Sequence, residues 1–170
     1  MPRVEFSIDS DVPADRVFAA ITDFTERRPD WWPNLSRKYY EVHETGENHA
    51  VCTEGSDVMG GVWAKERYEW SDGEVRATVE DSNIFESGVW EMKVEERDGG
   101  SHIDVVNHRK FKGAKGRFLG ATVALMGKPV LRRDLEKTLE ILKREGPEVA
   151  GEGAEPAGEG EAPAGETSSG

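Results

Sequence analysis

The sequence has a single cysteine, Cys52, and no long apolar run. One cysteine excludes an internal disulfide and any zinc site built on several thiolates. The longest apolar-leaning run, 118–126, contains Gly120 and Thr122 and falls short of the roughly 20 residues that a membrane span needs. The amino-terminal residues also lack the apolar core of a signal peptide. We therefore expect a cytoplasmic protein without integral membrane association.

Basic residues are scarce, with 22 Lys and Arg against 34 Asp and Glu and a net charge of −12. Because nucleic acids and anionic membranes bind to basic surfaces, we expect neither as a partner. Half of the net charge comes from residues 146–170, a Gly-, Ala-, Glu- and Pro-rich tail that holds six Glu and no Lys, Arg or aromatic residue. Such a tail cannot bury enough apolar surface to offset its ordering entropy, so we predict that it is disordered and follows one folded domain over 1–145. A solubilising role is the simpler interpretation of the tail, and contact with a protein partner is the alternative.

The sequence also lacks the usual patterns of nucleophilic, metal and phosphate chemistry. It has no G-x-S-x-G motif and no glycine-rich phosphate loop after a strand. The spacing of His43, His49, His102 and His108 is not that of a metal site. Cys52 has no recognisable base near it in the sequence, and we predict that it is a small buried residue. We therefore expect no metal and no cofactor, and no catalytic residue can be identified.

Short segments of alternating apolar and polar residues lie between two helical segments. Residues 4–8 predict a half-buried strand, Pro13 suits the first turn of a helix, and an aromatic turn follows at 31–33. Glycine-containing turns join six further predicted strands, at 37–45, 49–54, 62–70, 74–81, 88–95 and 102–111. An amphipathic helix is predicted over 129–145. The glycines within 113–127 favour a flexible segment at the entrance of a pocket.

This order predicts an α+β fold, in which a curved antiparallel sheet of about seven strands wraps around a long C-terminal helix and two short helices follow the first strand. The layout, together with the segment Val-Pro-Ala-Asp-Arg-Val-Phe-Ala-Ala-Ile-Thr-Asp at 12–23, resembles the SRPBCC superfamily. That superfamily includes START-like lipid-transfer domains, polyketide cyclases/dehydrases and birch-pollen-allergen-like proteins. The resemblance covers about 3–145 and implies a helix-grip fold with a hydrophobic pocket between the sheet and the C-terminal helix. It implies no particular activity, because the members share a cavity rather than a catalytic motif.

Strand alternation assigns the residues to faces without the resemblance. The charged alternate positions of 62–70 should face water, which turns Glu66, Tyr68 and Trp70 inward. The same argument turns Trp90 and Met92 inward on the segment 88–95, and Asp81 inward on the segment 74–81. The two faces therefore predict an aromatic inner wall.

Three polar residues, Glu66, Asn107 and Arg109, interrupt inward faces that are otherwise apolar or aromatic. An unpaired charge there would be costly, so each should be paired, hydrated or in contact with a ligand. We hypothesise that they form the polar part of a cavity whose walls include Tyr68, Trp70, Trp90 and Met92. The alternatives are a Glu–Arg pair that only fixes strand register, or a strand assigned one residue out of phase. Trp31-Trp32-Pro33, with Tyr39 and Tyr40, either caps the mouth of this cavity or packs against the sheet edge.

The function that we expect is the binding of a hydrophobic or amphipathic small molecule, such as a lipid, a quinone or a polyketide. The alternative is an enzyme of the polyketide cyclase/dehydrase type, with Glu66 or Asp81 as its acid or base. A second alternative is a protein-interaction module on the same fold, with the acidic tail contacting a basic partner.

Overall fold

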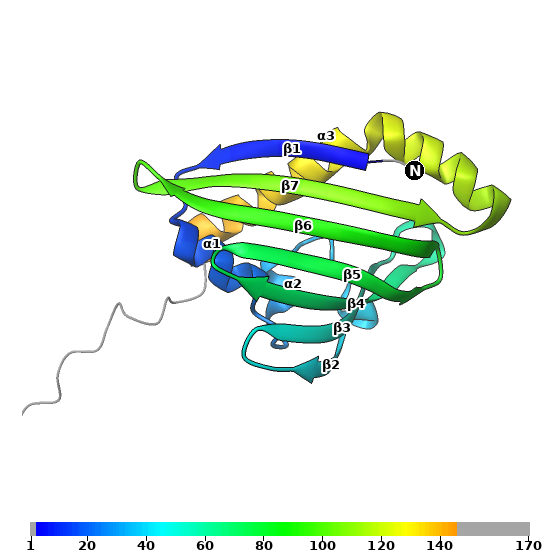
Figure 1. The fold of residues 1–170 in the computed structure, drawn as a ribbon, viewed down its shortest axis with the longest axis horizontal. Helices are drawn as coiled ribbons and strands as arrows, with labels where there is room; N and C mark the ends of the chain where they lie inside the picture. The colour runs from blue at the N-terminus through cyan, green and yellow to red at the C-terminus, as the bar shows by residue number, and fades with distance from the viewer. Residues whose placement is uncertain (1–2, 146–170) are drawn as a thin grey trace, which may run out of the picture.

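The computed structural model describes residues 3–145. Within this range it describes only the backbone of Met59 and of 114–126. The elements run in the order β1 (Arg3–Ser10), α1 (Ala14–Ile21), α2 (Arg28–Trp31), the 3-10 turn η1 (Arg37–Tyr39), β2 (Glu41–Thr45), β3 (His49–Ser56), the 3-10 turn η2 (Val58–Gly60), β4 (Val62–Ser71), β5 (Glu74–Ser82), β6 (Phe85–Arg97), β7 (Gly100–Phe111) and α3 (Gly113–Glu145). Figure 1 shows this arrangement.

The strands form one antiparallel sheet of seven strands in the order β1-β7-β6-β5-β4-β3-β2. Strands β2 to β6 each pair with the next strand along the chain, and β1 pairs with the free edge of β7. The three helices lie on one side of the sheet, where α3 contacts β1 and β7 and α1 contacts β6 (Figure 1). We call this helix-covered side the inner face. The predicted fold class is confirmed.

The core lies between the inner face and the helices. Val4, Phe6 and Ile8 on β1 are buried, and the residues between them are exposed, as the alternation predicted. Val17 and Ile21 on α1 are also buried and belong to the same apolar cluster. The alternating strand and the amphipathic helix thus bury their apolar sides in the same core.

The C-terminal helix is longer than expected. It begins at Gly113 and continues through Pro129, whereas the sequence predicted a helix only over 129–145. Each glycine costs a helix only about 1 kcal/mol relative to alanine, and a helix that is already nucleated extends through such residues. The predicted apolar stripe of the later part is present, because Leu135, Leu139 and Leu142 are buried.

The strand predicted over 37–45 is shorter than expected. Residues 37–39 form η1, in which the Tyr39 backbone N–H donates to the Ser36 carbonyl at 2.9 Å, and β2 starts only at Glu41. The turn places the Tyr39 side chain against Gly61, where an added Cβ would lie 2.2 Å from the Tyr39 hydroxyl oxygen. Gly61 also has a φ of 107°, which favours glycine. The first residues of the predicted strand therefore form a 3-10 turn, and Tyr39 in this turn packs closely on Gly61.

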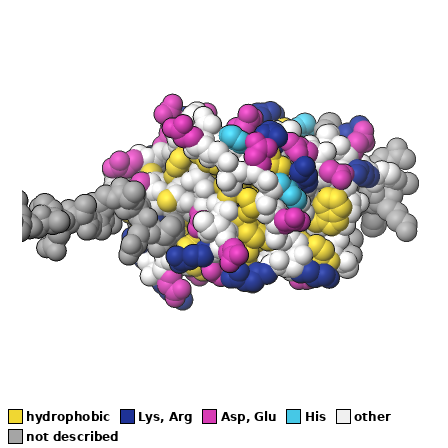
Figure 2. All heavy atoms as spheres, turned by 90° about the horizontal axis from the view of Figure 1, so that it is seen from below, with side chains coloured by type: hydrophobic (Ala, Val, Ile, Leu, Met, Phe, Trp, Pro, Cys, Tyr) yellow, Lys and Arg dark blue, Asp and Glu magenta, His cyan; other side chains and the backbone are white. Residues whose placement is uncertain are grey.

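Charged residues of both signs lie on the sheet face away from the helices. Arg67 pairs with Glu80 at 2.9 Å, and Arg76 pairs with Glu91. Figure 2, which views the molecule from below, shows basic and acidic side chains intermingled, with hydrophobic atoms between them. None of the described helices has an apolar stretch long enough to cross a membrane.

Candidate functional site

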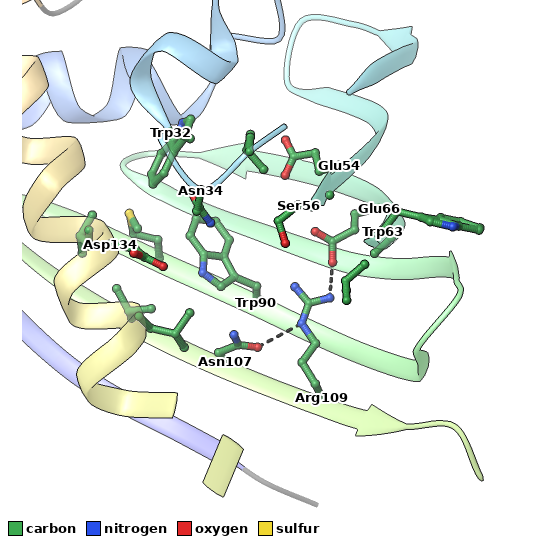
Figure 3. A pocket seen from close by; sticks show the side chains of 18 of the residues that line it. Trp32, Asn34, Glu54, Ser56, Trp63, Glu66, Trp90, Asn107, Arg109 and Asp134 are labelled. Carbon is green, nitrogen blue, oxygen red and sulfur yellow. Dashed lines mark hydrogen bonds and ion pairs between the residues drawn. The ribbon is translucent and has the colours of Figure 1, made fainter. Parts of the chain in front are cut away.

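A cavity of about 240 Å³ lies between the inner face of the sheet, α3 and the segment around α2. Its described walls are largely apolar and include Phe6, Trp32, Phe85, Trp90, Met92 and Leu135. Polar side chains also line it, among them Arg28, Asn34, Glu54, Glu66, Asn107 and Arg109. Figure 3 shows how the labelled residues surround the space, with Trp63 directed away from it.

The strand register explains why these residues share one face. Trp90 on β6 is opposite Asn107 on β7, and Gly88 is opposite Arg109. Residues directly opposite each other in an antiparallel pair point to the same side of the sheet. The inward direction of Trp90 therefore also fixes that of Asn107 and Arg109.

Glu66 and Arg109 form an ion pair within the cavity wall (Figure 3). Their side chains are only 6% and 14% exposed. The Arg109 Nε also donates to Asn107 Oδ1 at 3.1 Å, and the guanidinium lies 5.1 Å from the ring centroid of Phe85. Arg109 therefore points inward, and the alternative of a strand assigned out of phase is wrong.

Tyr68 extends this polar arrangement toward β3. Its hydroxyl donates to Glu54 Oε2 at 2.8 Å and lies 3.3 Å from Glu66 Oε2. Burial, together with the nearby carboxylates of Glu54 and Glu66, raises the pKa of Tyr68 well above its ordinary value. The hydroxyl therefore stays protonated and remains a hydrogen-bond donor.

Arg28 closes the arrangement from the side of α2. The residue is 3% exposed, its Nε donates to Glu54 Oε1, and its Nη1 donates to the Ile21 carbonyl at 2.6 Å. Its guanidinium also lies 4.3 Å from the ring centroid of Phe24. Burial lowers the pKa of Arg28, but the charge of Glu54, the other polar groups nearby and the hydrogen bond to Glu54 together outweigh this effect and raise that pKa above its ordinary value, so Arg28 stays charged. We call this continuous arrangement the polar network; it consists of Arg28, Glu54, Tyr68, Glu66, Arg109 and Asn107.

The structure brings together six of the seven predicted ligand-binding residues. These six all line the cavity: Glu66, Tyr68, Trp90, Met92, Asn107 and Arg109. Their contact with a ligand stays a prediction. Trp70 is not in the described lining, because its ring stacks on Phe24 with 5.5 Å between the centroids. Its predicted place in the cavity wall is therefore wrong.

Asp81 does not face inward as the alternation predicted. Lys65 is opposite Asp81 and Glu66 is opposite Val79, so Glu80 is an extra residue on β5. Such a bulge reverses the side to which the following residues point. The Asp81 side chain is 64% exposed, and Ser82 is buried instead. Asp81 is therefore no candidate for an acid or base in the cavity.

The aromatic turn has two different roles. Trp31 is buried, and its indole N–H donates to Asp23 Oδ2 at 2.7 Å, so the packing interpretation holds for this residue. Trp32 lines the cavity, as the capping interpretation proposed. Tyr39 and Tyr40 lie outside the described lining, so the capping interpretation does not hold for them.

Glu54 and Arg28 are cavity residues that the sequence interpretation missed. The alternation of Ala50 and Cys52 on β3 could have identified Glu54, which is the next residue on that face. Arg28 lies in a run of charged residues and gives no such signal. Cys52 is buried as predicted; its burial raises the pKa of the thiol, which therefore stays protonated.

The model of a family described as polyketide cyclase / dehydrase and lipid transport matches residues 1–146. The chain belongs to this family. The predicted superfamily is thereby confirmed, and family and fold together indicate a ligand-binding protein. No curated protein sequence matches the chain.

Several solved structures have a similar fold, and each of the three described next aligns with most of this chain. The protein TTHA0849 from Thermus thermophilus is 15% identical, with a TM-score of 0.65 over 84% of this chain and 94% of its own. The Zhui aromatase/cyclase from a Streptomyces species is 18% identical, with a TM-score of 0.64 over 82% and 90%. A START superfamily protein from Mycobacterium smegmatis is 13% identical, with a TM-score of 0.64 over 82% and 98%. At these identities the likeness establishes the fold alone.

Proposed function

We propose that the protein binds a hydrophobic or amphipathic small molecule, of the quinone or polyketide type, in the cavity between the sheet and α3. The observation that carries this proposal is the combination of aromatic and aliphatic walls with a buried polar network. Binding sites for small molecules typically have mostly apolar walls and a few placed polar groups. Burial of ligand surface against the walls supplies affinity, and the polar groups orient the ligand.

The size of the cavity favours a compact ligand. Its volume of about 240 Å³ lies just below the ~300–1,000 Å³ that is usual for small-molecule sites. A fused-ring compound fills such a space and stacks on Trp32 and Trp90, whereas a long-chain lipid would extend beyond it. The shared fold of an aromatase/cyclase is consistent with a polyketide-like compound.

Native mass spectrometry of the protein purified from its host tests the proposal directly. We expect a bound small molecule that is released on unfolding. Ala64 is 7% exposed and lines the cavity, so Ala64→Phe should fill the space and lower the occupancy at least tenfold. Lys65→Phe, one residue away on the opposite face, is the matched control and should retain the molecule. Equal occupancy in both variants would contradict binding in this cavity.

An enzyme of the cyclase/dehydrase type is the second candidate, because the Glu66 carboxylate lies in the cavity wall. A carboxylate in a cavity wall can take up a proton from a bound substrate as a general base, and the Arg109 guanidinium holds that of Glu66 in place. Turnover of an aromatic polyketide analogue should then be lost in Glu66→Gln and retained in Asp81→Asn. If the unaltered protein binds the analogue without turning it over, the enzyme alternative is contradicted and only the binding function remains.

The third interpretation, a protein-interaction module, depends on the acidic tail at 146–170, which lies outside the described residues. Deletion of 147–170 should leave ligand binding intact if the cavity is the functional site. A weakened complex with a protein partner after this deletion would support the interaction module instead.

A further inference from the structure

We infer that the cavity selects uncharged ligands that present a hydrogen-bond acceptor, such as a carbonyl oxygen, to Arg109 and Asn107, and that it rejects carboxylates. The inference rests on the proposed function, because it concerns the ligand of the same cavity. It comes from the balance of charges in the described lining and from the direction of the hydrogen bonds there.

Both arginines of the described lining are paired with a carboxylate. Arg109 pairs with Glu66, and Arg28 pairs with Glu54. The remaining charged residue of the described lining is Asp134 on α3, whose side chain is 28% exposed and lies 4.0 Å from Lys137. The described residues that line the cavity therefore provide no excess positive charge to balance an anionic ligand.

A carboxylate placed on Arg109 would lie beside the carboxylate of Glu66. Glu66 is 5% exposed, so water screens this repulsion only weakly. Figure 3 places Asp134 on the α3 side of the same space, where it adds a second repulsion. Repulsion of this kind lowers the affinity for an anion by about 10- to 100-fold relative to a neutral ligand of the same shape.

Hydrogen-bond donors nevertheless face the ligand. The Nε and Nη1 of Arg109 donate to Asn107 and Glu66, and a guanidinium carries further N–H groups on Nη2. Asn107 accepts the Arg109 bond through Oδ1, and its amide N–H groups have no acceptor among the side chains that the structure describes, so they can donate. Figure 3 shows Arg109 on the side of the space away from Asp134, with Asn107 beside it toward the middle. Donors without excess charge favour a neutral acceptor, and a ketone or quinone carbonyl has this chemistry.

A matched pair of probes tests the inference on the full chain. Acetylnaphthalene and naphthoate, substituted at the same ring position, have nearly the same shape and differ in charge. We expect the unaltered protein to bind the ketone at least tenfold more tightly in calorimetry near neutral pH. Glu66→Gln removes the charge that balances Arg109, so this preference should fall at least tenfold or reverse. Glu91→Gln removes the partner of Arg76 on the outer face and should keep the original preference.

The outcomes separate the inference from the proposed function. If naphthoate binds as tightly as the ketone, the inference is overturned and the cavity is still a binding site. If both probes bind Glu66→Gln with the original preference, the role of the Glu66–Arg109 pair is overturned. If neither probe binds the unaltered protein, both the inference and binding of compact aromatic ligands are overturned. The comparison in the unaltered protein needs no variant, so a misfolded Glu66→Gln would not prevent the test.

Discussion

Glu66 and Arg109 form a part-buried ion pair although their strands, β4 and β7, are not neighbours in the sheet. Two strands, β5 and β6, lie between them, which corresponds to about 14 Å of sheet at the usual strand spacing. The two side chains therefore extend over the inner face of the intervening strands and meet there. The pair forms part of the cavity wall, so its stability and the shape of the cavity depend on each other.

The loss of one partner of this pair should destabilise the protein strongly. Arg109→Met leaves the Glu66 carboxylate buried without its cation, and we expect the free energy of unfolding to fall by about 3 kcal/mol. The double variant Glu66→Gln/Arg109→Met removes both charges and should recover most of this loss. Urea unfolding of the two variants measures the difference. Equal losses in both would show that the charge of Glu66 is not the cause.

Gly88 gives Arg109 the room to lie across the sheet. A Cβ at this position would be 2.5 Å from Arg109 Cδ and 3.0 Å from the His108 carbonyl oxygen. We expect Gly88→Ala to move Arg109 away from Glu66 and to cost about 1–3 kcal/mol of stability. The same substitution made together with Glu66→Ala/Arg109→Ala should cost less, because the displaced side chain is gone. Thermal unfolding measures the stability lost through Gly88→Ala in the unaltered protein and in the double variant. An equal loss in both would show that the added Cβ clashes with the His108 carbonyl oxygen rather than with the Arg109 side chain.

Strand periodicity was enough to predict much of the candidate site. Glu66, Asn107 and Arg109 were recognisable because they interrupt apolar faces, and Asn107 and Arg109 share a face because they lie two residues apart on β7. The ion pair itself was one of the predicted alternatives. Its position across two intervening strands was not predictable, because it depends on how the chain folds in three dimensions.

The failures have local physical causes. The inward direction predicted for Asp81 was wrong because a bulge at Glu80 changes the side to which Asp81 points. No turn residue marks this bulge in the sequence. The place predicted for Trp70 in the cavity wall was wrong because Phe24, from the connection after α1, packs against its ring. Arg28 was missed because nothing in a charged run shows that one of its members is buried. Alternation thus predicts the face of a strand residue, but not the partner that comes from a distant element.

Lysine should not replace Arg28, although it preserves the charge. The guanidinium contacts Glu54 through Nε and the Ile21 carbonyl through Nη1, and a single ammonium cannot occupy both positions. We expect Arg28→Lys to lower the free energy of unfolding by about 2 kcal/mol and to weaken ligand binding, because Glu54 also holds Tyr68. Urea unfolding and calorimetry measure the two effects. Arg27→Lys is the neighbouring control, and an equal loss in that variant would contradict a specific role for Arg28.

The pairing of His102 with Asp9 makes stability depend on pH at the contact between β1 and β7. His102 Nδ1 lies 2.6 Å from Asp9 Oδ1, and this hydrogen bond raises the pKa of His102 above its ordinary value of 6.5. The same bond lowers the pKa of Asp9 below 3.8. Asp104 and Arg97 also face the imidazole.

The sign of the effect follows from these two shifts. The contribution of His102 is fully present below the pKa of the unfolded chain and is lost as the pH rises through the higher pKa of the folded protein. The contribution of Asp9 is lost only in acid, as the pH falls through its lowered pKa. Asp9→Asn should therefore destabilise the protein most between pH 3.8 and 6.5 and progressively less at higher pH. An NMR titration should show the pKa of His102 falling toward its ordinary value in this variant, and an unchanged titration would exclude Asp9 as the cause of the shift.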